Sequence, residues 1–309
     1  MSEHRPFRFL ATSALVVAGC ASAQHSNASD ADNPAHPIGP IVEATNKPEP
    51  IGKLLANLDL QMRAWNAKYL SAQTPQDRNK ATDLEKSLIT ITHKRRAEII
   101  QQLESGPLNN RIVAASALGF TRDPEVLSPL LAALEDDHDE VVGNALLGLM
   151  LLGQKDTPLD KICSLLQSSP DEGVRRNAAQ CLAALVQSGD RAECVLPAAR
   201  QGLADVDPGV RSQCILVLAT LVDQPSVPAI CDRLFDDTPL VAAAAARAVA
   251  FVGGQSAPDK GTCARALAKA YSEIRGPMRT QMRRALVELA GSDHGNEPEE
   301  WVAWASRLP

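Results

Sequence analysis

A run of four acidic residues and one histidine is the first candidate for chemistry in this sequence. It consists of Asp136, Asp137, His138, Asp139 and Glu140, and carboxylate and imidazole groups so close together could bind a divalent cation. Five consecutive residues across the start of a helix cannot all point at one ion, however. Acidic side chains there also cap a helix and interact favourably with its dipole. We therefore predict a capping role for this run and no metal site.

Motifs that mark catalytic sites are missing from the sequence. It contains no H-E-x-x-H, G-x-S-x-G or C-x-x-C pattern, which would indicate zinc, nucleophile or redox chemistry. The stretch from Gly253 to Thr262 is faintly similar to a phosphate-binding loop but lacks its spacing and a preceding strand. We predict no catalytic residues and no cofactor.

Cysteines offer a second possible chemistry. Six follow Cys20 in the chain: Cys163, Cys181, Cys194, Cys214, Cys231 and Cys263. None has the neighbouring histidine or charge pattern of a nucleophile. Cys181 and Cys214 fall at inward helix positions where alanine otherwise appears, which favours buried free thiols. Bridges between first and second helices, such as Cys163 with Cys181, are the alternative, since an oxidising compartment would allow them.

The N-terminus predicts export from the cytoplasm. Residues 1–19 begin with basic side chains and continue with an apolar run from Phe9 to Ala18. This run is shorter than the roughly 20 residues that span a bilayer, and the pattern is typical of a signal peptide. Cleavage near Ala23 and Gln24, as in an ordinary secretory peptide, is one interpretation.

A lipoprotein is the other interpretation, and we favour it. The sequence Val17-Ala18-Gly19-Cys20 resembles the lipobox of bacterial lipoproteins. That resemblance implies cleavage before Cys20 and acylation of its thiol, for example with palmitate, so that acyl chains hold the protein on a membrane. Ala21 instead of Asp after the cysteine implies sorting to the outer membrane, facing the periplasm. Residues 20–50 are rich in Pro, Ser, Asn and Asp and predict a disordered tether.

The remaining chain is organised around residues 123–152, which predict one antiparallel helix pair. Asp123 and Pro124 are typical of a helix start. Apolar residues then follow at helical spacing: Val126, Leu127, Leu130, Leu131 and Leu134. The acidic run ends this first helix, and a second apolar helix is expected from about Val141 to Leu152.

This pair recurs along the chain. Counterparts of the second helix are anchored at Asn110, Val141, Val174, Val210 and Leu240. These anchors lie about 30 to 36 residues apart, with a small residue four positions after each, and fixed-period self-similarity of this kind indicates a solenoid.

The repeats resemble the HEAT-repeat family. The segments Asp171 to Leu182, DEGVRRNAAQCL, and Asp207 to Arg211, DPGVR, are similar to that family's acid, Val-Arg and Ala-Ala-x-x-Leu signature. Arg111 also occupies the arginine position, whereas Val142 and Val241 depart from it. The resemblance covers roughly residues 94–290 and implies an α-solenoid.

We therefore predict an all-α fold, an α-solenoid of about five to six HEAT-like helical hairpins with an N-terminal helical cap. The expected organisation is a signal peptide at residues 1–19, a lipid-anchored tether at 20–50, an N-terminal helical cap at 51–93, HEAT-like repeats at 94–290 and a C-terminal cap at 291–309.

Both caps contain aromatic residues. Trp65 and Tyr69 belong to an apolar stripe that predicts core packing, and Thr74 is expected to cap the following helix. Trp301 and Trp304 could seal the last repeat. An exposed aromatic binding patch is the alternative for these two tryptophans.

Charge argues against a nucleic-acid partner. The formal net charge is −6, and the acids fall mainly in turns between helices, whereas wrapping nucleic acid needs a continuous basic surface. The one basic cluster, residues 93–96, predicts a solvated helix face.

A protein partner is the expected ligand, and the concave face of the second helices is the expected site. Candidate contacts from helical phase are Asn144, Leu147, Arg176, Asn177, Gln180, Gln213 and Arg247. The helices at 141–152 and 240–252 are apolar nearly all round, which predicts burial by neighbouring repeats or, alternatively, an apolar strip for a partner.

The sequence thus predicts a non-catalytic scaffold lipoprotein of the bacterial cell envelope, bound to a membrane through Cys20 and to an unknown protein. One alternative is a structural protein that binds peptidoglycan or another polymer through Trp301 and Trp304. A less favoured alternative is a chromophore lyase or its chaperone, because some HEAT-like proteins have that role.

Overall fold

The computed structural model describes residues 48–309. The predicted signal peptide at 1–19, the lipidation site Cys20 and the tether as far as residue 47 lie outside the described residues. Within residues 48–309 the chain is all-helical, with no strand. None of the helices in this part of the chain is long and apolar enough to cross a bilayer.

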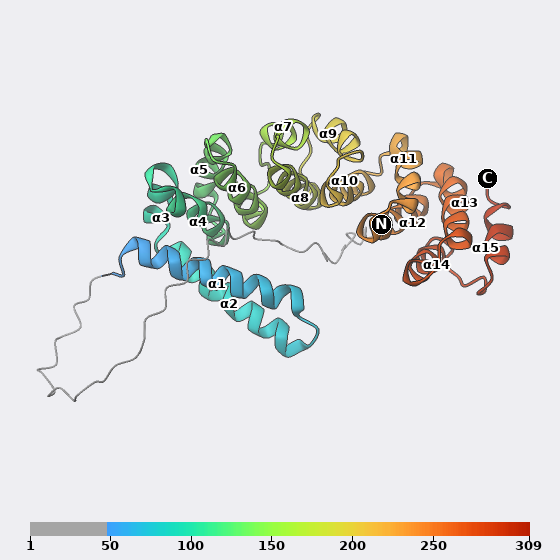
Figure 1. Ribbon diagram of the computed structural model, residues 1–309, viewed down its shortest axis with the longest axis horizontal. Coiled ribbons are helices and arrows are strands. Elements are labelled where there is room, and N and C mark those ends of the chain that lie inside the picture. The colour runs from blue at the N-terminus through green and yellow to red at the C-terminus, as the bar shows by residue number, and fades with distance from the viewer. Residues whose placement is uncertain (1–47) are drawn as a thin grey trace, which may run out of the picture.

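Six helical hairpins follow one another in a row, which confirms the predicted solenoid. The first helices of the hairpins are α3 (Arg96–Ser105), α5 (Leu127–Ala132), α7 (Asp160–Ser168), α9 (Val195–Gly202), α11 (Val227–Asp232) and α13 (Ala257–Glu273). The second helices are α4 (Leu108–Leu118), α6 (Asp139–Leu152), α8 (Glu172–Ser188), α10 (Pro208–Thr220), α12 (Pro239–Gln255) and α14 (Pro277–Ala290). Each second helix packs on the next, and Figure 1 shows them on the inner side of an arched row.

The first helices of the second and fifth hairpins are interrupted. The 3-10 turns η2 (Pro124–Val126) and η3 (Ala133–Glu135) flank α5, and η4 (Gln224–Ser226) and η5 (Arg233–Phe235) flank α11. Pro129 and Pro228 lie within these short helices, and proline supplies no backbone N–H for an intrahelical bond. The predicted helix from Asp123 is therefore three short segments, although Asp123 does accept a hydrogen bond from the Glu125 N–H, as a cap should.

Neighbouring repeats bury the apolar second helices. In α6 nearly every residue from Val141 to Leu149 is buried, and α12 is buried in the same way. The burial depends on a close approach of α6 to α4. A Cβ atom at Gly148 would lie only 2.3 Å from the carbonyl oxygen of Ala115 on α4, so only glycine fits there. Burial within the row is therefore the correct interpretation, and an open apolar strip on α6 is not present.

The repeat register needs one correction. Val241 is fully buried at the third position after the N-cap Thr238, as Val210 is after Asp207. Leu240, which the sequence pattern suggested as the anchor, is 49% exposed. The anchor of the fifth copy is therefore Val241, one residue later than predicted. Ala242 then occupies the position that corresponds to the arginine of the repeat signature.

An N-terminal hairpin covers the first repeat. It consists of α1 (Ile51–Ser71) and α2 (Pro75–Lys94), packs against α4, and projects on the side of the second helices (Figure 1). The predicted cap at Thr74 is confirmed, since Thr74 and Asp77 form a reciprocal capping box. Trp65 is buried edge-on against Phe120, with ring centroids 5.1 Å apart, whereas Tyr69 is largely exposed.

The C-terminal helix α15 (Pro298–Ala305) packs on α13 at the other end. Trp301 is fully buried, and its Nε1 donates a hydrogen bond to the Gly295 carbonyl oxygen at 2.9 Å. Trp304 is partly buried against it, with ring centroids 5.8 Å apart. The two rings therefore seal the last repeat. A polymer-binding patch that needs Trp301 exposed is wrong, because this ring has no exposed surface.

The cysteines also differ from the expectation. Cys163 on α7 and Cys194, the N-cap residue of α9, form a disulfide with a Cα–Cα distance of 6.1 Å. This bond joins the first helices of adjacent hairpins, not a first helix to a second one. Cys181 and Cys214 are buried free thiols, as predicted, and Cys231 and Cys263 are free as well.

Candidate interaction surface

A ladder of arginine–aspartate pairs joins successive repeats. In each pair the guanidinium binds both carboxylate oxygens: Arg111 with Asp136 at 2.9 and 3.2 Å, Arg175 with Asp205 at 2.8 and 3.2 Å, and Arg211 with Asp236 at 2.9 and 2.8 Å. Each arginine is on a second helix, and each aspartate is in the turn of the next hairpin. These are the arginines of the repeat signature, and their role here is structural.

The role predicted for the acidic run is correct in part: Asp139 and Glu140 lie in the first turn of α6, where carboxylates interact favourably with the helix dipole, whereas Asp136 belongs to the ladder. The N-cap of α6 is His138, whose side chain makes no capping bond, and the Asp136 carboxylate instead binds Arg111. Burial opposes ionisation of Asp136, but hydrogen bonds from Arg111 and the His138 N–H, together with the charge of Arg111, hold its pKa below the ordinary value. Nowhere between residues 48 and 309 do three or more metal-ligating side chains come together.

Two arginines of the basic cluster at 93–96 form ion pairs with other residues of the fold. Arg96 pairs with Asp123 and Glu125 of the second hairpin, and Arg95 pairs with Glu98. The prediction of a solvated helix face is therefore wrong for these two arginines.

Several of the predicted contact residues connect the repeats instead of facing outward. Asn177 on α8 donates through Nδ2 to the Gly143 carbonyl oxygen of α6 at 3.1 Å. Arg176 donates through Nε to both carboxylate oxygens of Asp207, the N-cap of α10, at 3.1 and 3.0 Å. These two side chains hold α8 between its neighbours.

Two more of the predicted residues are inaccessible, and one is turned onto its own helix. Leu147 is 3% exposed and Gln180 is 9% exposed, so neither presents a surface to a partner. Asn144 is partly exposed, and its Nδ2 donates to the Glu140 carbonyl oxygen at 2.7 Å within α6. Of the remaining candidates, Gln213 on α10 is partly exposed and Arg247 on α12 is exposed.

Arg247 has a like-charged neighbour on the next second helix. Its pKa is lowered, first because the guanidinium is partly desolvated and second because of the positive charge of Arg284 on α14, with Glu288 acting in the opposite direction. Arg284 was not among the residues predicted for a binding surface. The composition of α14 could have indicated a basic surface, because this helix contains three arginines and one acidic residue in a chain of negative net charge.

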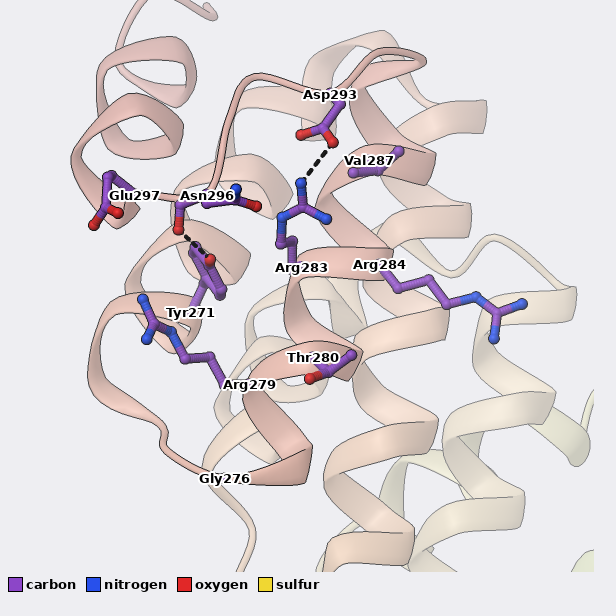
Figure 2. A pocket seen from close by; sticks show the side chains of 10 residues that line it. All are labelled: Tyr271, Gly276, Arg279, Thr280, Arg283, Arg284, Val287, Asp293, Asn296 and Glu297. Carbon is purple, nitrogen blue, oxygen red and sulfur yellow. Dashed lines mark hydrogen bonds and ion pairs between the residues drawn. The ribbon is translucent and has the colours of Figure 1, made fainter.

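A pocket of about 850 Å³ opens beside these arginines, between α13, α14 and the connection to α15 (Figure 2). Its lining consists of Tyr271, Gly276, Arg279, Thr280, Arg283, Arg284, Val287, Asp293, Asn296 and Glu297. Figure 2 shows that Arg283 points toward Asp293 while Arg284 extends away from that pair. The pocket therefore presents basic groups in more than one direction.

Internal bonds fix the walls of the pocket. Arg283 binds Asp293 at 2.5 Å and also donates to the Gly295 carbonyl oxygen at 3.2 Å. The Gly295 N–H, and then Arg283, lower the pKa of Asp293, so this carboxylate is charged at neutral pH. Tyr271 donates through its hydroxyl to the Asn296 carbonyl oxygen at 2.5 Å.

Arg279 retains unused hydrogen-bonding capacity. Its guanidinium lies over the Tyr271 ring, with 4.8 Å between Cζ and the ring centroid. Its Nε is buried and has no hydrogen-bond partner among the described residues. Stacking on the ring holds the guanidinium plane in place, and a guanidinium so held can bind a carboxylate or another anionic group through its outer nitrogens.

Comparison with known proteins agrees with the repeat architecture. The family described as HEAT repeats matches residues 96–183, the first three hairpins. No curated protein matches the chain.

Several solved structures are similar to the chain. One engineered protein is 19% identical with a TM-score of 0.48, covering 63% of this chain and 96% of its own. A second engineered protein is 16% identical with a TM-score of 0.47, covering 83% and 76%. The complex of CpcE and CpcF of phycocyanin lyase from Nostoc sp. is 20% identical with a TM-score of 0.42, covering 68% and 93%. The repeat match and the observed hairpins together make this chain a HEAT-like helical repeat protein.

Proposed function

We propose that this protein is a non-catalytic interaction scaffold that binds an acidic segment of a protein partner. The binding surface is the C-terminal end of the second-helix layer, where α12 and α14 meet and the arginine-lined pocket opens. The observation that carries the proposal is the arginine-lined pocket along α14, where Arg284 extends away from the Arg283–Asp293 pair. Arg247 of α12 is close enough for the charge of Arg284 to lower its pKa.

The electrostatics of the pair favour an acidic ligand. Burial and the charge of Arg284 both lower the pKa of Arg247, which means that its charged form is destabilised in the free protein. A carboxylate of a bound partner would add to the effect of Glu288, which already favours the charged form of Arg247. Arg279, whose guanidinium lies over the Tyr271 ring, adds another cationic group to the lining of the pocket.

The N-terminal half of the same layer is less suited to this role. Arg176 and Asn177 already bind neighbouring repeats, and Leu147 is buried. The first turn of α6 carries Asp139 and Glu140, which would repel an acidic partner. Charge complementarity therefore favours the C-terminal half.

We further propose a location in the bacterial cell envelope. The lipobox-like sequence before Cys20 supports a lipid anchor, and Ala21 supports sorting to the outer membrane. The Pro-rich segment to residue 50 supports a tether that holds the solenoid away from the bilayer. In this proposal the scaffold binds its partner at the membrane surface that faces the periplasm.

Charge reversal tests the binding surface. The full chain carrying Arg247→Glu and Arg284→Glu is compared with a matched double reversal, Arg78→Glu and Lys80→Glu, on the exposed face of α2. The probe is a fluorescent peptide of ten glutamates, titrated at low and high salt. We expect the first variant to lose at least tenfold in affinity and most of the salt dependence, and the control to bind like the wild type. Equal affinity of both variants would refute the acidic-ligand proposal.

Crosslinking in cells tests the scaffold itself. The anchored protein is compared with its Cys20→Ala form, and crosslinked peptides are mapped by mass spectrometry. We expect crosslinks between α12 or α14 and an acidic segment of one protein, dependent on the anchor. Efficient crosslinking that yields no protein partner would contradict a scaffold role.

A further inference from the structure

The disulfide between Cys163 and Cys194 is part of a pattern. It connects α7 to the start of α9, the first helices of the third and fourth hairpins, across a sequence separation of 31 residues. Because all first helices lie in one layer, this bond joins two adjacent repeats on the side opposite the second helices (Figure 1).

Cys231 and Cys263 occupy a corresponding arrangement two hairpins later. Cys231 is on α11 and Cys263 is on α13, the first helices of the fifth and sixth hairpins, and these helices are in contact. Their numbers differ by 32, and the two thiols share a hydrogen bond, so the sulfur atoms already face each other.

We propose that Cys231 and Cys263 are a site of disulfide formation, which joins the fifth and sixth hairpins as the Cys163–Cys194 bond joins the third and fourth. Gly253 on α12 contributes to this geometry: a Cβ there would lie 2.8 Å from the Cβ of Cys263. The glycine therefore leaves room for Cys263 in the contact with α11.

The other two free cysteines lack this arrangement. Cys181 and Cys214 are on the second helices α8 and α10 and are fully buried. Burial raises the pKa of each thiol, so neither ionises readily. They stay reduced under conditions that oxidise the proposed pair, and they serve as an internal control.

The reaction is thiol–disulfide exchange with a small disulfide such as oxidised glutathione. The thiolate of Cys263 attacks the oxidant, forms a mixed disulfide and releases one thiolate. The Cys231 sulfur then attacks Cys263 Sγ and releases the second thiolate. One protein disulfide forms, the oxidant is reduced to two thiols, and both cysteine protons go to the released thiolates. The hydrogen bond from Cys231 lowers the pKa of Cys263.

Two such bonds would divide the last four hairpins into two covalently joined pairs. The junction between the fourth and fifth hairpins would have no disulfide and would be held by noncovalent contacts, including the Arg211–Asp236 pair. Within the last four hairpins, bending would then concentrate at this junction, between α10 and α12, next to the proposed binding surface.

Thiol mapping of the full chain in its Cys20→Ala form tests the proposal. The folded protein is incubated with oxidised glutathione, denatured, alkylated without reduction and digested. We expect the number of alkylated cysteines to fall from the four free ones, Cys181, Cys214, Cys231 and Cys263, to Cys181 and Cys214 alone. A crosslinked peptide containing Cys231 and Cys263 should appear at the same time.

A substitution pair supplies the control. In Cys231→Ala protein, oxidation should leave Cys263 alkylated, whereas Cys214→Ala should form the crosslinked peptide like the parent. Unfolding temperature should rise on oxidation only where the crosslink forms. Alkylation of both Cys231 and Cys263 after oxidation of the folded parent, or pairing of either with Cys181 or Cys214, would overturn the proposal.

Discussion

Arg211 of α10 forms two parallel hydrogen bonds with Asp236 in the turn before α12, Nε to Oδ2 at 2.9 Å and Nη2 to Oδ1 at 2.8 Å. Only 13% of the arginine side chain and 3% of the aspartate side chain are exposed. Asp236 also accepts a hydrogen bond from the Thr238 N–H. This single carboxylate therefore fixes both the contact between two repeats and the turn that starts the next second helix.

Removal of Arg211 should destabilise the protein strongly. Arg211→Ala leaves the buried Asp236 carboxylate with only the longer ion pair to Arg233 at 3.5 Å, so the loss should approach the value of about 3–5 kcal/mol that is typical of a broken buried pair. Arg211→Lys should have a smaller effect, because it restores the charge without the bidentate geometry. Denaturant unfolding of both variants measures the difference, with Arg78→Ala on the exposed face of α2 as the control. A loss in Arg211→Ala no larger than in the control would contradict this role.

Acid should weaken the ladder. Burial opposes ionisation of Asp136, Asp205 and Asp236, yet hydrogen bonds from arginine and from backbone N–H groups keep the pKa of each carboxyl below its ordinary value. A depressed folded-state pKa contributes stability that is present above the unfolded-state pKa, near 4, and is lost as pH falls through the folded-state value.

The free energy of unfolding should therefore be nearly constant from pH 7 to about 5 and should fall below about pH 4. Denaturant titrations at several pH values measure this. The Asp236→Asn variant should show a shallower fall than the wild type. A profile that is equally steep in both proteins would mean that Asp236 takes no part in it.

Gly148 should not tolerate alanine. The added Cβ would meet the Ala115 carbonyl oxygen at 2.3 Å, a backbone atom that cannot move without separating α4 from α6. We expect a loss of roughly 3 kcal/mol, at the upper end of overpacking effects. The matched control is Gly254→Ala in α12, where nothing lies within 4 Å of the new Cβ. Helix propensity predicts that the control gains up to about 1 kcal/mol, and equal losses at the two sites would refute the close-contact argument.

Trp301 should act as the C-terminal seal. Trp301→Ala removes a fully buried ring and the hydrogen bond to Gly295, a change that typically costs about 3–5 kcal/mol. Because repeats contact only their neighbours, the loss should appear as faster amide hydrogen exchange in α13, α14 and α15, with α4 to α8 little affected. Val302→Ala on the exposed side of α15 is the control. Uniformly faster exchange along the row would contradict a local seal.

The positions of most helices were predictable because they depend on local rules. Apolar residues at helical spacing, Pro124 and Pro208 at helix starts, and the Thr74–Asp77 capping box each act within a few residues. The repeat period then followed from counting such segments. The fifth anchor was wrongly predicted at Leu240, because Leu240 and Val241 are both apolar and only burial against α10 and α14 distinguishes them.

The candidate site was predicted less well. Helical phase indicated that Arg176 and Asn177 face away from the core of their own hairpin, but it could not indicate that Asp207 and Gly143 receive them. The same limit applies to Cys163, whose partner Cys194 is 31 residues away. Arg284 was missed as a binding residue because its importance depends on Arg247, on a helix that only the packing places beside it.

The sequence by itself determined the helices, the period of the repeat and the expectation of a lipid anchor, because each of these depends on neighbouring residues or on composition. Only the tertiary structure decided which side chains join the repeats, which cysteines pair and which arginines remain at a surface. Those outcomes depend on contacts between helices about 30 residues apart in the chain, which are fixed by how closely the hairpins stack. No local pattern specifies that distance.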